Sequence, residues 1–299
     1  MPLPAGARVG VAVVILTFNE QLNLAQALRS VHGWAHEVYV FDSFSADRTV
    51  EIARELGAQV MQHRFENYAR QRNAALDLLP IRSDWVLFLD ADEWLPEALK
   101  LEIDALIARN PVENGFYLPR RFIWMGRWIR RGYYPTWILR LFRRGKGRCE
   151  DRSVNEHFTV EGATGRLRND FIHEDLRGVS DWIDKHNRYT TLEARELFRQ
   201  RSEQAGEIDA RLFGTQAQRK RWLRHRVFNR MPPLLRPFLY WAYRYVLLGG
   251  FLDGREAFIY HFLQALWYQF LIDVKYLEMK WQQARNDGQR TGAVPRRDA

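Results

Sequence analysis

The chain has 299 residues, a formal net charge of +9 at neutral pH and 46% hydrophobic residues. This length can hold one large α/β domain with an extension, and the hydrophobic content excludes a disordered chain. The excess of Lys and Arg favours anionic partners, such as nucleic acid, acidic lipid or phosphorylated substrates. Cys149 is the only cysteine, which excludes an internal disulfide and a metal site built on thiolates. The first ten residues have no apolar core of signal-peptide length, so we expect the catalytic part in a reducing compartment.

Strands and helices are predicted to alternate over the first ninety residues. The first run, 9–18, is an almost uninterrupted series of Val, Ile and Leu, which is typical of a strand covered on both faces. This alternation predicts a parallel sheet with helices on both faces, and Gly57 is expected to end the second helix. The predicted strands are 9–18, 37–43, 58–63 and 85–90, and the predicted helices are 21–32, 46–57 and 66–79.

Polar side chains follow the predicted strands at their carboxyl ends, where such sheets bind ligands. Carboxylates that gather at one edge repel one another unless a cation lies between them, and a divalent metal is the usual candidate. A solvated loop is the alternative for the acidic run 90–93, but the convergence of polar groups favours a site. The residues are Thr17, Asn19, Glu20, Asp42, Asp90 and Asp92.

The segment TFNEQLN after the first strand lacks a glycine-rich phosphate loop. It has neither the GxGxxG pattern of dinucleotide-binding sheets nor the GxxxxGK[ST] pattern of P-loops. A dehydrogenase or a P-loop enzyme is therefore disfavoured. A nucleotide bound here needs a metal and basic side chains to neutralise its phosphates.

Four motifs follow one another in order: VVILTFNE, VFDSFSADRTVEIARELGA, YARQRNAAL and WVLFLDADEWL. Together they resemble the inverting family 2 glycosyltransferases, and the later PRRFIWMGRWIRRGYYPTWILRLFRRG resembles the bacterial branch that builds lipopolysaccharide core and exopolysaccharide. The resemblance covers about 10–190. It implies the GT-A fold, an α/β, Rossmann-like nucleotide-sugar-binding domain with a mainly parallel central sheet. Phe44 stands where the family often has glycine, so we expect a different turn there and a different contact of this loop with the base or ribose.

The resemblance implies transfer from a nucleotide-diphosphate sugar, with UDP-hexose as the expected donor. It makes Asp92 the direct Mn²⁺ or Mg²⁺ ligand, with Asp90 contacting the ribose or a metal-bound water. Oxygen ligands suit both ions, so the choice between them stays open. Asp42 is expected at the uracil edge and Arg72 at the base or phosphate. The implied donor-nucleotide residues are Thr17, Asn19, Glu20, Asp42, Arg72 and Asp90.

Inversion needs a general base that takes the proton of the attacking acceptor hydroxyl. Members of the family place a carboxylate for this after the sheet, and the segment DRSVNEHF supplies Glu156, with Asp151 as its competitor. We expect Glu156 to be the base. His157 and His173 are candidates for an additional metal or diphosphate ligand.

The segment 119–148 is dense in arginine and aromatic residues. Aromatic faces stack on sugar rings and arginines bind phosphate, which suits a phosphorylated or lipid-diphosphate-linked glycan acceptor. Single-stranded nucleic acid also fits such a patch, but no nucleic-acid-binding module accompanies it, so no nucleic acid partner is expected. The expected acceptor- and phosphate-binding residues are Trp128, Arg130, Arg131 and Arg140.

The last third of the chain combines basic residues with aromatic-rich apolar stretches. The stretch 257–272 is free of Asp, Glu, Lys and Arg but is too short to span a bilayer. We expect helices that lie in the interface of an anionic membrane; a buried helical subdomain or a homo-oligomer interface is the alternative. The expected domains are 8–198 for the glycosyltransferase, 199–285 for the helical membrane-interface or oligomerisation extension, and 286–299 for a disordered tail.

These features predict a metal-dependent inverting glycosyltransferase, peripheral on the inner, cytoplasmic face of the bacterial cytoplasmic membrane. It would move a sugar to a lipid-linked, lipopolysaccharide or exopolysaccharide acceptor. A nucleotidyl- or phosphotransferase is disfavoured because a phosphate loop is missing. From another class, the alternative is a catalytically inactive scaffold in a polysaccharide-assembly complex. The intact Asp90, Asp92 and Glu156 argue against it.

Overall fold

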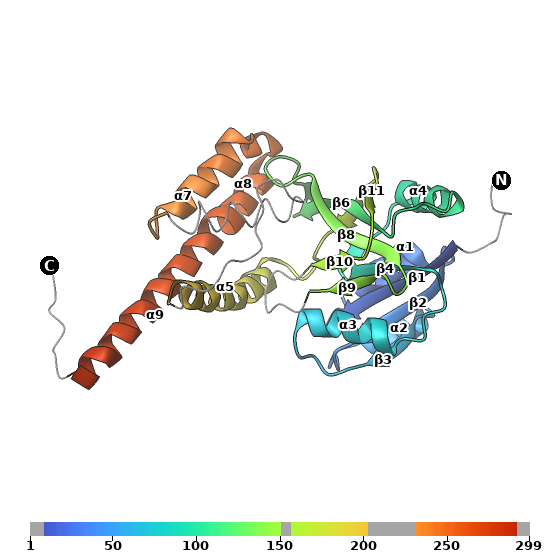
Figure 1. Cartoon of the computed structure of the whole chain (residues 1–299). Helices are drawn as coiled ribbons and strands as arrows, with labels where there is room; N and C mark the ends of the chain where they lie inside the picture. Colours follow the sequence, from blue (N-terminus) through green and yellow to red (C-terminus); the bar gives the residue numbers. More distant parts are fainter. Residues whose placement is uncertain (1–8, 151–156, 203–230, 292–299) are drawn as a thin grey trace. The chain divides into compact units, whose positions relative to one another are not determined.

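The computed structural model describes residues 9–150, 157–202 and 231–291. The chain divides into two compact units, Met1–Gly178 and Val179–Ala299 (Figure 1). The sequence predicts 180–198 as part of the first domain, whereas the structure groups this segment with the second unit.

The first unit confirms the predicted alternation, and each element of the first ninety residues lies within three residues of its expected ends. Gly57, with a φ of 78°, follows the second helix as predicted. The helices are α1 (Leu24–Val31), α2 (Thr49–Glu55), α3 (Tyr68–Leu78) and α4 (Glu97–Ala108). The strands are β1 (Val9–Thr17), β2 (Ala35–Asp42), β3 (Gln59–Gln62), β4 (Trp85–Asp90), β5 (Glu93–Trp94), β6 (Gly115–Trp124), β7 (Arg127–Trp128), β8 (Thr136–Arg143), β9 (Gly147–Cys149), β10 (Phe158–Val160), β11 (Thr164–Arg166) and β12 (Phe171–His173).

One ten-stranded sheet forms the centre of this unit, with the main strand order β3-β2-β1-β4-β8-β6-β12-β5. The first four strands are parallel, because helices cross over between them. Strand β8 then runs antiparallel to both β4 and β6. Strands β9 and β10 form a separate hairpin. The predicted α/β class with a parallel centre is therefore confirmed.

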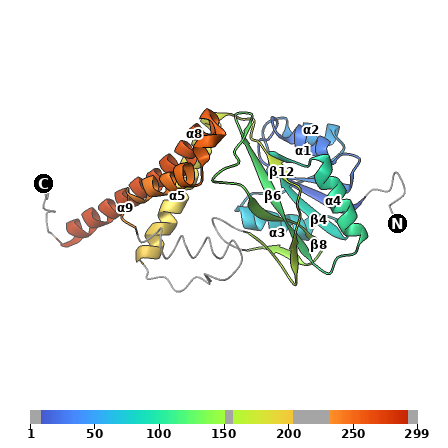
Figure 2. The same cartoon turned by 90° about the horizontal axis from the view of Figure 1, so that it is seen from above.

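Apolar side chains pack on both faces of the sheet. Successive side chains of a strand point to opposite faces. Val11 and Val13 pack with residues of α1 and α4 on one face, while Ala12 and Val14 pack with residues of α3 on the other (Figure 2). Because both faces of β1 are covered in this way, its side chains are apolar at successive positions rather than at alternate ones. The carboxyl ends of β1, β2 and β4 meet at one edge, where the polar residues gather.

The second unit is helical. Helix α5 packs against α9 through Ala194, Leu197, Tyr268 and Ile272, and α7 lies beside η4 (Figure 1). Helix α9 continues into the segment 286–299 that the sequence predicts to be disordered. Within the described residues, no helix has both the length and the apolar character needed to cross a bilayer. The elements are α5 (Val179–Ser202), α7 (Arg236–Trp241), η2 (Ala242–Leu247), η3 (Gly250–Asp253), α8 (Arg255–His261), η4 (Phe262–Trp267) and α9 (Tyr268–Thr291).

Candidate active site

Asp42, at the end of β2, is fully buried and saturated with hydrogen bonds. Its carboxylate accepts from Thr17 Oγ1 at 2.8 Å, from the backbone N–H of Ser45 at 2.9 Å and from Gln62 Nε2 at 3.0 Å. Thr17 is itself buried. The sequence predicts Asp42 at the uracil edge. In the structure these donors engage both of its oxygens, which gives Asp42 a part in the scaffold, and its place at the uracil edge stays a prediction.

The loops after β1 and β2 contain two residues with positive φ, Asn19 at 54° and Phe44 at 59°. The N–H of Asn19 donates to Ser45 Oγ at 2.9 Å and joins the two loops. Phe44 keeps the left-handed conformation that favours glycine, so its presence does not remove that backbone shape. Phe18 and Phe44 are each 58% exposed. The sequence predicts a contact of the Phe44 loop with the base or ribose but does not single out Phe18, although both rings flank the predicted nucleotide residues.

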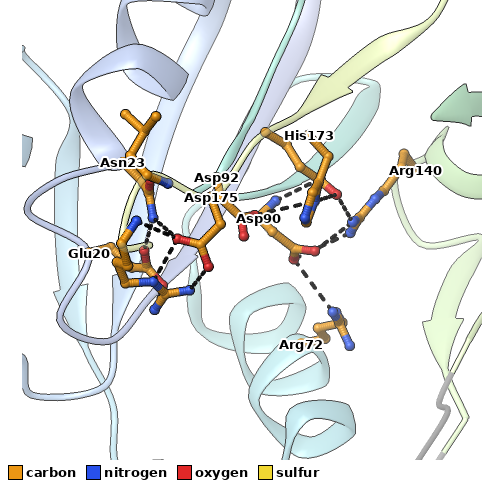
Figure 3. A network of polar contacts seen from close by, with 11 residues as sticks. Glu20, Asn23, Arg72, Asp90, Asp92, Arg140, His173 and Asp175 are labelled. Carbon is orange, nitrogen blue, oxygen red and sulfur yellow. Dashed lines mark hydrogen bonds and ion pairs between the residues drawn. The ribbon is translucent and has the colours of Figure 1, made fainter. Parts of the chain in front are cut away.

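Glu20 belongs to a second network, which joins the start of α1 to the segment after β12 (Figure 3). Arg177 lies 3.0 Å from Glu20 Oε1 and 2.6 Å from Asp175 Oδ2. Asn23 Nδ2 donates to both carboxylates, at 2.8 and 3.1 Å. Burial opposes ionisation of Asp175, but hydrogen bonds from Arg177 hold the pKa of this carboxyl well below its usual range. Asn23 and Asp175 lie 152 residues apart, so no local motif could predict the contact.

Asp90 ends β4 between two arginines (Figure 3). Arg140 Nη2 lies 2.6 Å from Asp90 Oδ2 and 2.6 Å from Glu93 Oε1, and Arg72 Nη2 lies 3.6 Å from Asp90 Oδ1. Burial opposes ionisation of Asp90, but Arg140 and Arg72 overcome it and hold the pKa well below its usual range. The sequence predicts Arg140 to bind acceptor or phosphate. In the structure its side chain is 5% exposed and its guanidinium pairs with two carboxylates, so binding of acceptor or phosphate by Arg140 stays a prediction.

Asp92 has different surroundings from Asp90, two residues before it. Its side chain is 7% exposed, and the described residues donate no hydrogen bond to its carboxylate. His173 Nδ1 lies 3.6 Å from Asp92 Oδ1 and 3.6 Å from Glu93 Oε1. This nitrogen is also buried and has no hydrogen-bond partner in the described part of the chain. Buried polar atoms normally have a partner, so the buried Nδ1 of His173 beside the Asp92 carboxylate indicates a place for an external group.

The pair fits a divalent cation held partly by the substrate. Among the described residues, no three His, Cys, Asp or Glu side chains are grouped to hold a metal. Asp92 Oδ1 and His173 Nδ1, 3.6 Å apart, can both bond one ion, since two bonds of about 2.1 Å span up to about 4 Å. Mg²⁺ and similar ions keep waters and bind through one or two protein ligands plus substrate phosphates. Asp90, expected at the ribose or a metal-bound water, pairs with two arginines, and its part in the metal site stays a prediction.

The two candidate bases, Glu156 and Asp151, lie outside the described residues. The two ends of the segment that contains them are described. The backbone N–H of Glu150 donates to the carbonyl of His157 at 3.0 Å and extends the β9–β10 hairpin. His157 is exposed on this hairpin.

The hairpin is fastened to α3 close to Asp90. Asn73 binds both backbone groups of Cys149 at 2.9 Å. Arg72, the neighbour of Asn73, lies 5.9 Å from the ring centre of Phe158 and also contacts Asp90. Cys149 and Phe158, on the two strands of the hairpin, therefore contact neighbouring residues of α3, and one of these, Arg72, also contacts Asp90.

Trp128 carries arginines over its ring. The Cζ atoms of Arg121 and Arg130 lie 4.2 and 4.3 Å from the ring centre. Arg121 also pairs with Asp170 at 3.0 Å, while Arg130 and Arg131 are exposed. The two guanidiniums place positive charge over this ring. Acceptor or phosphate binding by Trp128, Arg130 and Arg131 stays a prediction.

The family model for glycosyl transferase family 2 matches residues 12–177. This chain belongs to that family. The protein is a glycosyltransferase, and its α/β sheet with a helical extension is the GT-A fold expected from the motifs. The predictions of family, fold and enzyme class are therefore confirmed.

Individual proteins show how far the similarity extends. The chain is 29% identical over 199 residues to "Lipopolysaccharide core biosynthesis glycosyltransferase LpsC" of Rhizobium meliloti, which covers 62% of this chain and 71% of the relative. It is 40% identical over 204 residues to an uncharacterized glycosyltransferase of Rickettsia prowazekii, with 64% and 68% covered. A mannosyltransferase from Pyrobaculum calidifontis, solved in complex with GDP-Man and Mn²⁺, shares the fold with 15% identity, a TM-score of 0.50, and 91% and 88% covered.

Proposed function

We propose that the protein transfers a hexose, with inversion and with the help of a divalent metal, from a nucleotide-diphosphate donor to a lipid-linked, lipopolysaccharide or exopolysaccharide acceptor. UDP-hexose is the first donor to test. The observation that carries the proposal is the buried carboxylate of Asp92, which receives no hydrogen bond from the described residues and lies 3.6 Å from His173 Nδ1. The similarity to a relative named for lipopolysaccharide core biosynthesis, and to a mannosyltransferase solved with a nucleotide sugar and Mn²⁺, supports it.

Asp92 and His173 would hold Mn²⁺ or Mg²⁺, which would neutralise the charge that develops on the departing diphosphate. Arg140 and Arg72 keep Asp90 ionised and fixed, so that its carboxylate can accept a hydrogen bond from the ribose. Glu156 would take the proton of the acceptor hydroxyl as it attacks the anomeric carbon, with Asp151 as the second candidate. Attack opposite the diphosphate inverts the configuration.

The acceptor in this proposal is anionic. Arg121, Arg130 and Arg131 concentrate positive charge around Trp128, which suits a phosphate or diphosphate on the growing glycan. Acceptors of this kind are lipid-linked, so we place the enzyme at the cytoplasmic face of the bacterial cytoplasmic membrane. A peripheral location agrees with the net charge of +9.

Thermal denaturation with UDP, GDP, CMP or ADP, each with and without Mn²⁺, tests the proposal. A ligand that binds only the folded state raises the melting temperature. We expect a rise with UDP that needs Mn²⁺ and that is lost in Asp92→Asn. Asp77→Asn, at an exposed acid of α3, is the matched control and should keep the rise. A rise with GDP would change the donor, and no rise with any nucleotide would contradict the proposal and favour the scaffold.

A further inference from the structure

The second unit exposes apolar side chains at the turn between η2 and η3. Gly249, with a φ of 71°, makes this turn. Single exposed apolar residues need no explanation, but a contiguous group marks a binding surface. We call this group the apolar tip; its side chains are 40–76% exposed and belong to Tyr243, Val246, Leu247, Leu248, Phe251 and Leu252.

The helices that carry the apolar tip are firmly packed. Arg236 of α7 and Asp273 of α9 form an ion pair, and both side chains are almost fully buried, at 2% and 0% exposed. The N–H of Leu234 also donates to Asp273 at 2.8 Å. Beside the turn, a Cβ added to Gly250 would meet the ring of His261 at 2.6 Å. This part of the unit thus buries a charged pair, at a desolvation cost, while it exposes large apolar residues. That distribution suits an apolar medium outside the helices.

The charges near the apolar tip are positive where they are exposed. Between Met231 and Ile272 the chain has two acids; Asp253 is 5% exposed and Glu256 pairs with Arg255 at 2.7 Å. The side chain of Arg255 is 90% exposed. In the sequence, the segment 219–230 directly before this region carries six Lys and Arg residues and no acid. A partner of this surface should therefore offer an apolar interior to the apolar tip and negative charge at its own surface to the neighbouring cations.

We propose that the apolar tip inserts into the interface of a bilayer that contains anionic lipid. Interfacial helices bury an apolar face about 5–10 Å deep and place cations among anionic headgroups, which matches this surface. A second copy of the chain is the other occupant to consider. A two-fold contact would bring the same surface of both copies together, and the two acids of this stretch are already paired or buried, so a second copy supplies few anions for exposed Arg255. The inference extends the proposed membrane location, but its test needs neither donor nor acceptor, so the two proposals can fail separately.

Sedimentation with vesicles tests the inference on the full chain. We compare phosphatidylcholine vesicles with vesicles that also hold about 30% phosphatidylglycerol. The wild type should bind the anionic vesicles at least about tenfold more strongly. The double variant Leu247→Glu/Phe251→Glu should lose about tenfold or more of this binding. Leu101→Glu/Val112→Glu, at two exposed apolar positions of the first unit, is the matched control and should bind like the wild type. Equal binding by all three proteins would overturn the inference.

A fluorescent label locates the contact without adding charge. Cys149 is buried, so an environment-sensitive dye should react at the new thiol of Leu247→Cys. We expect a blue shift on anionic vesicles for this variant and none for Leu101→Cys. No shift at position 247 would contradict insertion. Dimers in sedimentation equilibrium that Leu247→Glu/Phe251→Glu dissociates, with vesicle binding unchanged, would also overturn it and assign the apolar tip to a contact between copies.

Discussion

The two halves of the sheet edge differ in how their buried polar atoms are satisfied. At the ends of β1 and β2, Asp42 accepts hydrogen bonds from side chains and backbone and is closed to solvent. At the ends of β4 and β12, Asp92 and His173 lie side by side, with no hydrogen bond from the described residues to either the carboxylate or Nδ1. A saturated group holds the fold, whereas an unsaturated one awaits an ion, water or substrate. The same edge therefore contains a scaffold and a site.

Removing the charge of Asp92 is the change with the largest expected effect on activity. We expect Asp92→Asn to lower kcat/KM by about 10³-fold or more, or about 4 kcal/mol, because a metal ligand is lost. The metal-free melting temperature should stay the same or rise, since no hydrogen bond from the described residues is broken. Turnover assays and thermal denaturation without metal check both parts. Retained turnover with lowered stability would place Asp92 in the scaffold.

Breaking the neighbouring buried ion pair of Arg140 should instead act on stability. Arg140→Met leaves Asp90 and Glu93 without their shared partner, which should cost about 3–5 kcal/mol of unfolding free energy. Arg48→Met, at an exposed pair with Glu51, is the matched control and should show no measurable change. Urea denaturation measures both. Equal urea midpoints for the two variants would contradict the expectation that the buried pair stabilises the fold more than the exposed pair.

Asp42 tests the other half of the edge. In Asp42→Asn the amide oxygen can take the place of Oδ2, which accepts from the N–H of Ser45 and from Gln62. The NH₂ group then faces the hydroxyls of Thr17 and Ser45, which both donate to Oδ1 in the wild type and lose their acceptor. We expect a loss of about 1–3 kcal/mol in unfolding free energy, with a small change in the donor KM. Chemical denaturation and initial-rate kinetics separate the two quantities. A large rise in KM without loss of stability would place Asp42 at the uracil edge.

The Asp175 network should make the scaffold sensitive to acid. The pKa of Asp175 is lower in the folded protein than in the unfolded chain, so its stabilisation is complete above the unfolded value of about 3.9 and is lost as pH falls through the folded value. The wild type should therefore lose unfolding free energy more steeply than Asp175→Asn below about pH 5. Urea midpoints measured across a pH series check this. Parallel curves for the two proteins would mean that protonation of Asp175 does not change the unfolding free energy.

The sequence predicts features that depend on neighbouring residues, but it does not predict contacts between residues that lie far apart in the chain. The end of β4 at Asp90 is predictable because an apolar run and an acidic turn are local features. The partner of Asp90 is not, since Arg140 lies 50 residues away and meets it only in the folded sheet. His173 was one of two candidate histidines, and only the pairing of β12 with β5, which sets it opposite Glu93, selects it. The apolar tip is a similar case. The composition of the last third of the chain predicts membrane contact, but only the exposed fractions of the side chains in the structure identify which residues would make it.

Phe44 gives the prediction with the smallest expected effect. Phe44→Gly removes a left-handed cost of about 1–2 kcal/mol but adds unfolded-state freedom worth about 0.4–1 kcal/mol, so stability should change little. Strain at a binding edge persists when the side chain has a function. A ring that is 58% exposed beside the nucleotide loops can stack on a base, which is worth about 1 kcal/mol. We therefore expect the donor KM to rise about fivefold in Phe44→Gly and to stay unchanged in Phe44→Tyr. An unchanged KM in both variants would limit Phe44 to the turn, and the base would have to bind elsewhere along the scaffold half of the edge.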